Sequence, residues 1–213
     1  MDNYIFTVAD MMELPVMQGA IILAGRSGLG RRITSATVFD APDGLKWLKG
    51  DEMVITTLYP FKDDLSLQLY FINRLCQGGA AALGIKLERY FRTLPEEVIQ
   101  VANENDFPII SLPYDCAWID LINPILAEVM NRQLLELKRS EEIHRSLTDL
   151  VLRGGTLKSI ADVLYNLVQN PVLIGDFVTG NSACTPEEYF RDNQPVIHAL
   201  PWREKEGDIS SQA

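Results

Sequence analysis

Three short apolar runs, at residues 53–57, 80–85 and 107–112, predict three buried strands in the middle of the chain. Between them, apolar residues at helical spacing predict a helix over 65–76. A second helix over 95–102 begins with a proline, which suits a first helical turn. Consecutive strands that are joined by crossover helices run parallel. The sequence therefore predicts an α/β fold: a small three-layer domain with a mainly parallel sheet and a βαβαβ core.

The residues before this core predict a short capped helix and two further strands. Thr7 and Asp10 have the spacing of a helix cap, and the apolar runs 20–24 and 33–39 flank the glycine cluster 25–30. Strand, turn and strand is the economical interpretation, so we expect a hairpin. The cluster reads GxxGxG instead of the GxGxxG of dinucleotide-binding loops, and no Gly-Lys-Ser/Thr follows it. This spacing argues against a nucleotide site.

A long helix is predicted after the core, from the cap and first-turn pair Asn123-Pro124 to Arg153. A helix of this length extends about 45 Å, which is more than the core needs for cover. Its apolar stripe resumes after the polar residues 138–142, so the helix is expected to pack against a partner helix in a homodimer. The residues expected at this dimer contact are Leu126, Met130, Leu134, Leu137, Ile143 and Leu147.

The last part of the chain predicts a helix over 157–167 and a strand over 171–174, and then the pattern decays. After residue 179 the apolar runs are too short to complete a stable domain, so a poorly ordered tail is expected. The chain thus divides into a domain over 1–115, a long helix over 116–155 and an incomplete α/β region over 156–213.

Composition narrows the class of protein. Hydrophobic residues make up 47% of the chain and charged residues 23%, which is typical of a folded globular protein. The 19 basic and 29 acidic residues give a net charge of −10, the wrong sign for gripping a phosphate backbone, so the chain alone is not expected to bind DNA tightly. There is no secretion signal and no apolar run of about 18 residues. A cytoplasmic protein without membrane contact is expected.

The sequence offers no convincing metal or catalytic site. Cys76, Cys116 and Cys184 are widely spaced and are interpreted as reduced thiols, and only two histidines, His144 and His198, are available to help hold a metal. Ser27 lacks the G-x-S-x-G turn of serine hydrolases. Acidic pairs lie mainly where helix N-termini favour negative charge, so solvated caps explain them better than acid–base catalysis. We expect no metal, no cofactor and no enzyme activity.

The best candidate site lies where the predicted strands end. In open parallel sheets, ligands bind outside the carboxyl ends of the strands, because loops and helix N-termini present free N–H groups there. Lys86 is the one cation placed there for an anionic or carbonyl-bearing ligand, although a lone lysine is as often a solvated surface group. The threonine hydroxyls can also serve only the neighbouring backbone. The expected ligand-binding residues are Thr56, Thr57, Leu58, Tyr59, Gly84, Ile85, Lys86, Pro113 and Tyr114.

Several stretches in a fixed order resemble the N-terminal sensor domain of the purine catabolism regulator (PucR) family of bacterial transcription factors. They include TVAD at 7–10, WLKGDEMVITT at 47–57, GAAALGIK at 79–86 and PIISLP at 108–113. The resemblance implies a domain that senses a metabolite, a middle region similar to a GAF domain, and a C-terminal helix-turn-helix that binds DNA. In this chain the middle region looks incomplete and no helix-turn-helix sequence is visible, so it is expected to be either a fragment or a natural truncation.

Two functional hypotheses follow. In the first, a small polar effector, purine-derived by family analogy, binds at the strand ends and alters helix packing in a homodimer. DNA would then be contacted only through a C-terminal domain that this chain lacks. In the second, the chain is an oligomerisation module that forms mixed dimers with full-length regulators and has no ligand of its own.

Overall fold

The computed structural model describes residues 5–39, 41–87, 92–176 and 178–192. By its contacts the chain forms two compact units, Met1–Leu137 (the first unit) and Lys138–Ala213 (the second unit). The segment boundaries that the sequence predicts at residues 115 and 155 rest on motifs and not on packing, and they stay predictions. Of the tail after residue 179, for which poor order is expected, residues 193–213 lie outside the described residues.

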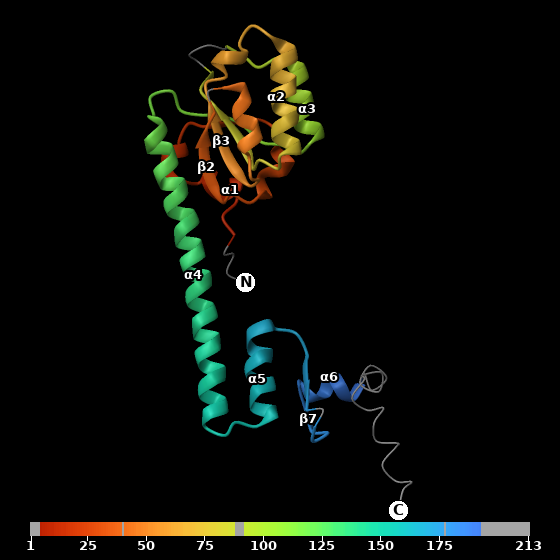
Figure 1. The fold of residues 1–213 in the computed structure, drawn as a ribbon. Coiled ribbons are helices and arrows are strands. Elements are labelled where there is room, and N and C mark those ends of the chain that lie inside the picture. Colours follow the sequence, from red (N-terminus) through yellow and green to blue (C-terminus); the bar gives the residue numbers. More distant parts are fainter. Residues whose placement is uncertain (1–4, 40, 88–91, 177, 193–213) are drawn as a thin grey trace, which may run out of the picture. The chain divides into compact units, whose positions relative to one another are not determined.

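The first unit is built on a five-stranded sheet in the order β1-β5-β4-β3-β2. Strands β2 to β5 pair in parallel, and β1 pairs with β5 in the antiparallel sense at one edge. Two crossover helices, α2 and α3, join β3 to β4 and β4 to β5 (Figure 1). The strands are β1 (Ile21–Ala24), β2 (Ser35–Val38), β3 (Glu52–Thr56), β4 (Ala82–Ile85) and β5 (Ile109–Ser111), and the helices are α2 (Leu65–Gln77) and α3 (Glu96–Glu104). The expected α/β fold with a βαβαβ core is confirmed.

Helices cover both faces of this sheet. On one face, Val54 and Leu83 belong to an apolar cluster with Phe71 and Leu75 of α2 and Val98 of α3. On the other face, a second cluster joins strand residues to α1 (Val8–Met12) and to the start of α4 (Trp118–Leu152). The two faces alternate along each strand because successive side chains point to opposite sides of a sheet. The first unit therefore has the three layers that the pattern predicts.

The expected hairpin between residues 20 and 39 is wrong, because β1 and β2 lie at opposite edges of the sheet. Two glycines of the cluster do not form a hairpin turn but allow the backbone to pack closely against residues 106 and 107. Gly25 has φ +65°, and a Cβ there would lie 2.0 Å from the carbonyl oxygen of Phe107. A Cβ at Gly28 would lie 1.9 Å from the carbonyl oxygen of Asp106. Only glycine lets these two segments pack together.

Short helices complete the connections of the first unit. The predicted cap of α1 is confirmed: the Thr7 hydroxyl accepts from the backbone N–H of Asp10 at 3.2 Å, and the Asp10 carboxylate accepts from the N–H of Thr7 at 2.9 Å. The two groups form a reciprocal capping box. The remaining short elements are the 3₁₀ helices η1 (Pro15–Met17), η2 (Arg26–Gly30), η3 (Pro42–Trp47) and η4 (Tyr59–Phe61).

The long helix α4 begins at Trp118, six residues before the predicted first-turn proline, so Pro124 lies inside the helix. A proline there removes one backbone hydrogen bond, a cost of about 3 kcal/mol in a helix interior. Leu121 and Ile125 are both 1% exposed in the cluster beneath the sheet. Burial of two such side chains contributes roughly 3–6 kcal/mol, which offsets the missing bond and extends the helix past the proline.

The second unit contains α5 (Leu157–Val168), a β6–β7 hairpin (Val172–Gly175 and Ser182–Thr185) and α6 (Glu187–Asp192). The first helix and first strand of this unit were expected. The sequence predicted a poorly ordered tail after residue 179, whereas residues 182–185 form β7 and residues 187–192 form α6. Within the described ranges, no helix is both long enough and apolar enough to cross a bilayer.

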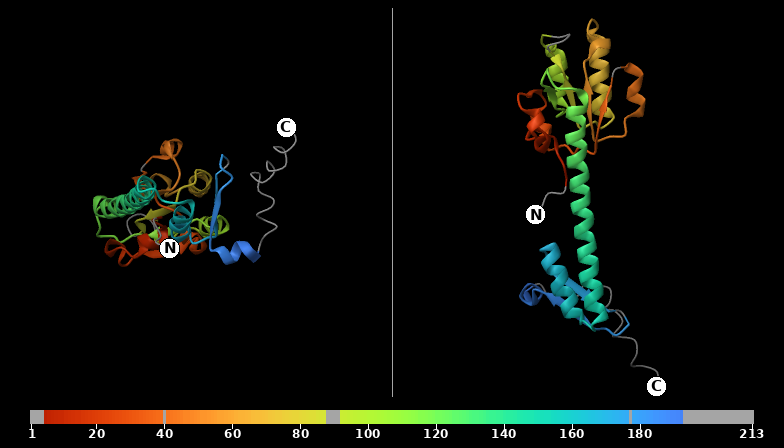
Figure 2. Two further views of the ribbon diagram at one scale, coloured as in Figure 1. Left: turned by 90° about the horizontal axis from the view of Figure 1, so that it is seen from below. Right: turned by 90° about the vertical axis from the view of Figure 1, so that its left-hand side faces the viewer.

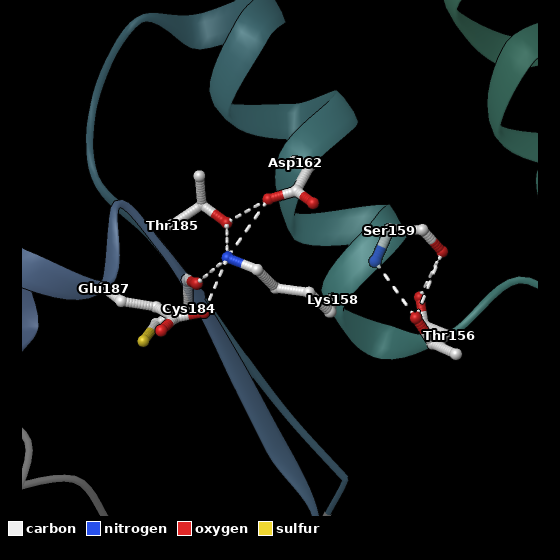
Figure 3. A network of polar contacts seen from close by, with 7 residues as sticks. All are labelled: Thr156, Lys158, Ser159, Asp162, Cys184, Thr185 and Glu187. Atoms are coloured by element: carbon white, nitrogen blue, oxygen red, sulfur yellow. Dashed lines mark hydrogen bonds and ion pairs between the residues drawn. The ribbon is translucent and has the colours of Figure 1, made fainter.

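Polar contacts hold α5 against β7 (Figure 3). The Lys158 ammonium donates to the carbonyl oxygen of Cys184 at 2.8 Å and to the Thr185 hydroxyl at 3.0 Å. It also lies 3.2 Å from the Asp162 carboxylate and 3.3 Å from that of Glu187. The Thr185 hydroxyl in turn donates to Asp162 at 2.5 Å. Lys158 thus connects a helix, a strand and the start of α6.

Candidate ligand site at the carboxyl ends of the strands

The last residues of the three central strands lie side by side. Thr56 of β3 is in register with Ile85 of β4, and Ile85 is in register with Ser111 of β5. The backbone N–H of Lys86 donates to the carbonyl of Thr56 at 3.4 Å, and that of Leu112 donates to Ile85 at 2.8 Å. The segments that follow the strands therefore leave the sheet at one edge, as expected. Whether this edge binds a ligand stays a prediction.

The two threonines shape the turn after β3. The Thr56 hydroxyl accepts from the backbone N–H of Leu58 at 3.0 Å, and the Thr57 hydroxyl accepts from that of Tyr59 at 3.3 Å. Leu58 has φ +53° and is 1% exposed, so its side chain anchors the turn in the core. Thr56 is fully buried, whereas Thr57 is half-buried and Tyr59 is exposed. Only Thr57 and Tyr59 of this group are open to a ligand.

Burial separates the other expected residues in the same way. Gly84 and Ile85 are buried, and a Cβ at Gly84 would lie 2.6 Å from the Met53 side chain and 2.8 Å from that of Leu112. Gly84 therefore serves the packing of the sheet. Pro113 and Lys86 are half-buried, and Tyr114 is exposed. The accessible part of the predicted site consists of Thr57, Tyr59, Lys86, Pro113 and Tyr114.

Lys86 makes contacts that the sequence does not reveal. Its ammonium donates to the carbonyl oxygen of Tyr114 at 3.1 Å and to that of Cys116, and it lies 4.6 Å from the centre of the Trp118 ring. Tyr114 and Cys116 belong to the segment between β5 and α4, and Trp118 is the first residue of α4. Lys86 therefore ties the end of β4 to the start of the long helix. No local signal links residues so distant in sequence.

The cysteines of the first unit are poor nucleophiles. Partial burial and the Asp120 carboxylate raise the pKa of the Cys116 thiol, against the opposing effect of the Lys86 ammonium. Burial raises the pKa of Cys76, against the opposing effect of Arg31. Both thiols are therefore protonated at neutral pH. Among the described residues, no group of three or more His, Cys, Asp or Glu side chains is placed to hold a metal ion.

The residues expected at a dimer contact lie along α4. In its first half, Val129 packs under the sheet, while Met130, Leu134 and Leu137 are 67%, 49% and 56% exposed. Leu126, Ile143 and Leu147 are half-buried. The helix thus buries one apolar face in the first unit and leaves a second apolar face open. The dimer itself stays a prediction.

The fold places the chain in the class of three-layer α/β domains. In this domain the parallel strands end beside Lys86, which contacts the start of a long helix. The model of the purine catabolism regulatory protein-like (PucR) family matches residues 10–129, which is more than half of the chain. The chain belongs to this family, and the resemblance stated from its motifs is confirmed.

A purine catabolism regulatory protein of Bacillus subtilis (strain 168) is 31% identical to the chain over 169 residues. The match covers 79% of this chain and 32% of that protein. The chain therefore spans about a third of the length of this curated relative. The name of this relative supports a proposal that this chain also has a regulatory function.

Proposed function

We propose that this chain is the N-terminal sensor part of a bacterial transcriptional regulator of the purine catabolism type. A small polar metabolite, purine-derived by analogy with the relative's name, binds at the strand-end edge in the cytoplasm. The signal passes to a dimer that is formed through α4. DNA is contacted by a helix-turn-helix outside residues 1–213, which agrees with the net charge of −10. The chain performs no catalysis.

The observation that carries this proposal is the position of Lys86. Its ammonium lies between the accessible strand ends and the first residue of α4. A ligand with a carboxylate or carbonyl oxygen at this edge competes with the carbonyls of Tyr114 and Cys116 for the same N–H donors. Binding then favours a state in which Lys86 no longer makes these contacts with the start of α4. A ligand shifts an equilibrium between two states when it binds one of them more tightly than the other.

Calorimetry with purine catabolites and related ureides tests the proposed site. Thr57 is the accessible hydroxyl of the turn after β3, so Thr57→Ala is expected to weaken binding about tenfold. Thr148→Ala is the matched control, because Thr148 is exposed on α4 in the second unit. Equal affinities of the wild type and Thr57→Ala, or binding of none of these compounds, contradict the proposal.

A second candidate function, a dimerisation module without its own ligand, is favoured by the open apolar face of α4. Met130, Leu134 and Leu137 follow one another at helical spacing and are exposed. This function predicts concentration-dependent association in sedimentation that survives Thr57→Ala and is lost in Leu134→Glu with Leu137→Glu. A chain that stays monomeric at high concentration excludes this candidate. Ligand binding in calorimetry favours the sensor instead.

A further inference from the structure

A cavity of about 260 Å³ lies at the opposite side of the sheet from β1, between the edge strand β2 and the 3₁₀ helix η3. Thr37 and Phe39 line it from the strand side, and Gly44 and Trp47 line it from η3. Glu52, the first residue of β3, completes the lining. Sites for drug-sized molecules hold about 300–1,000 Å³, so this cavity suits a smaller, fragment-sized ligand.

The Glu52 carboxylate is the charged group in the lining of this cavity. It is only 7% exposed, and its two carboxylate oxygens accept one hydrogen bond each, from the backbone N–H of Lys49 at 2.8 Å and of Gly50 at 3.2 Å. A carboxylate has about four acceptor positions, so two stay available. Among the described residues, no cation forms an ion pair with Glu52. A buried negative charge without a cation favours a ligand that brings N–H donors or positive charge.

The rest of the lining defines the shape of such a ligand. The Trp47 side chain is 64% exposed, and the Lys46 ammonium lies 4.4 Å from the centre of its ring, so the indole face already accommodates a cation. The Phe39 ring adds a second aromatic wall. The Thr37 hydroxyl makes no hydrogen bond with the described residues. A lining that combines two aromatic side chains with a carboxylate suits a small planar molecule that carries an amidine, guanidine or amide group.

We infer that this cavity is a second ligand site, specific for small planar nitrogen compounds whose N–H donors bind Glu52. Glu52 lies at the amino end of β3 and Trp47 lies in η3, whereas the strand-end edge follows the carboxyl ends of β3, β4 and β5. The inference does not depend on the proposed sensor function. Glu52 also stabilises the turn at Lys49 and Gly50, and this structural role is compatible with binding because it uses other acceptor positions.

Three probes of nearly equal shape test the inference: benzamidinium, benzamide and benzoate, which differ in the charge and donors of one planar group. Titration into the ¹⁵N-labelled full chain is followed by the Trp47 indole N–H and by the backbone amides of Thr37 and Gly44. Benzamidinium is expected to shift these signals and saturate, benzamide to bind at least about threefold more weakly, and benzoate not to bind. Equal binding of benzoate, shifts confined to other regions, or no saturation by any probe up to about 10 mM overturns the inference.

Two variants and a control assign the binding to the cavity. Glu52→Gln keeps the size of the side chain and removes its charge, and is expected to weaken benzamidinium binding at least about tenfold. Because Glu52 also supports a turn, Thr37→Leu provides an independent test: it fills the cavity from the edge strand and leaves Glu52 in place. Thr148→Ala, which lies exposed on α4, is expected to leave benzamidinium binding unchanged. Unaltered binding in Thr37→Leu, or equal loss in Thr148→Ala, overturns the site at β2.

Discussion

The first and second units both combine helices with a small sheet, but they are stabilised by different interactions. In the first unit two apolar clusters lie on the two faces of the sheet, and Phe71, Leu75 and Leu83 are fully buried. Among the described residues of the second unit, only Ala161 and Phe190 are buried. There the ammonium of Lys158 connects α5, β7 and α6 through polar contacts.

The difference indicates which unit folds by itself. Burial of apolar side chains contributes about 1.5–3 kcal/mol each, whereas partly exposed ion pairs contribute about 0–1 kcal/mol. The first unit therefore has the interactions of an independent domain. In the second unit, Leu157, Ile160, Leu164 and Leu167 of α5 remain half-buried, so its apolar face is only partly covered by the described residues. We expect the first unit to be the more stable part of the chain and the second unit to be the weaker part.

The largest effect is expected from Gly25→Ala in the first unit. A side chain at Gly25 meets the backbone of Phe107 and also requires φ +65°. The expected loss exceeds about 5 kcal/mol, enough to prevent the first unit from folding. Gly30→Ala is the matched control, because a Cβ at Gly30 meets nothing within 4 Å. Urea unfolding followed by circular dichroism compares the two. Near-wild-type stability of Gly25→Ala would show that this backbone contact is not required.

An intermediate effect is expected when the same substitution is made in the two units. Phe71 is fully buried and its ring centre lies 4.6 Å from that of Phe61, so Phe71→Ala is expected to cost about 3–5 kcal/mol. Phe190 is also buried, but among the described residues of the second unit the other large apolar side chains are half-buried or exposed. Phe190→Ala is therefore expected to cost only about 1–2 kcal/mol. Unit-specific amide signals in a urea titration measure both losses, and equal losses contradict the difference between the units.

The smallest effect is expected from acidification of the second unit. The hydrogen bond from the Thr185 hydroxyl and the nearby Lys158 hold the pKa of Asp162 below its ordinary value of 3.8, although partial desolvation opposes them. A carboxyl whose pKa is lowered by folding stabilises the fold above its unfolded pKa, and this contribution disappears as pH falls through the folded pKa. The second unit is thus expected to weaken below about pH 4.

Asp162→Asn separates this contribution from other acid effects. The Thr179 hydroxyl likewise lowers the pKa of Asp176, so some acid sensitivity remains in the variant. At pH 7 the variant is expected to be less stable than the wild type in α5 and β7, and this difference is expected to shrink as the pH falls below about 4. Amide signals of α5 and β7 across a pH series provide the measurement. A constant difference between the variant and the wild type at all pH values excludes this role for Asp162.

The sequence predicted the parallel core well, because each of β3, β4 and β5 is a continuous apolar run and the helices between them have a clear apolar face. It failed where the deciding contact is distant in sequence. The glycines after β1 resemble a turn, but they pack against residues 106–107, which a local pattern cannot reveal. The start of α4 was misplaced because burial of Leu121 and Ile125 outweighs the local signal of Pro124.

The sequence predicted that the ends of β3, β4 and β5 meet at one edge of the sheet, because this follows from the order of the strands. Ligand binding at that edge stays a prediction. Some of the selected residues are buried and therefore closed to a ligand. Gly84 and Ile85 are examples, because alternate positions of a strand point into the apolar clusters on the two faces of the sheet. The contacts of Lys86 with the segment before α4 depend on tertiary structure alone. Thr56 and Thr57 show the backbone role that was the alternative to ligand binding.

Native-state hydrogen exchange of the full chain tests the central claim, that the first unit is a self-sufficient domain and the second a weaker one. Amides in β3, β4 and β5 are expected to exchange only through global unfolding, because they lie between two apolar clusters. Amides in β6 and β7 are expected to exchange at least about 100-fold faster, through local opening. Equal protection of the two sheets, or faster exchange in β3–β5, would contradict the account.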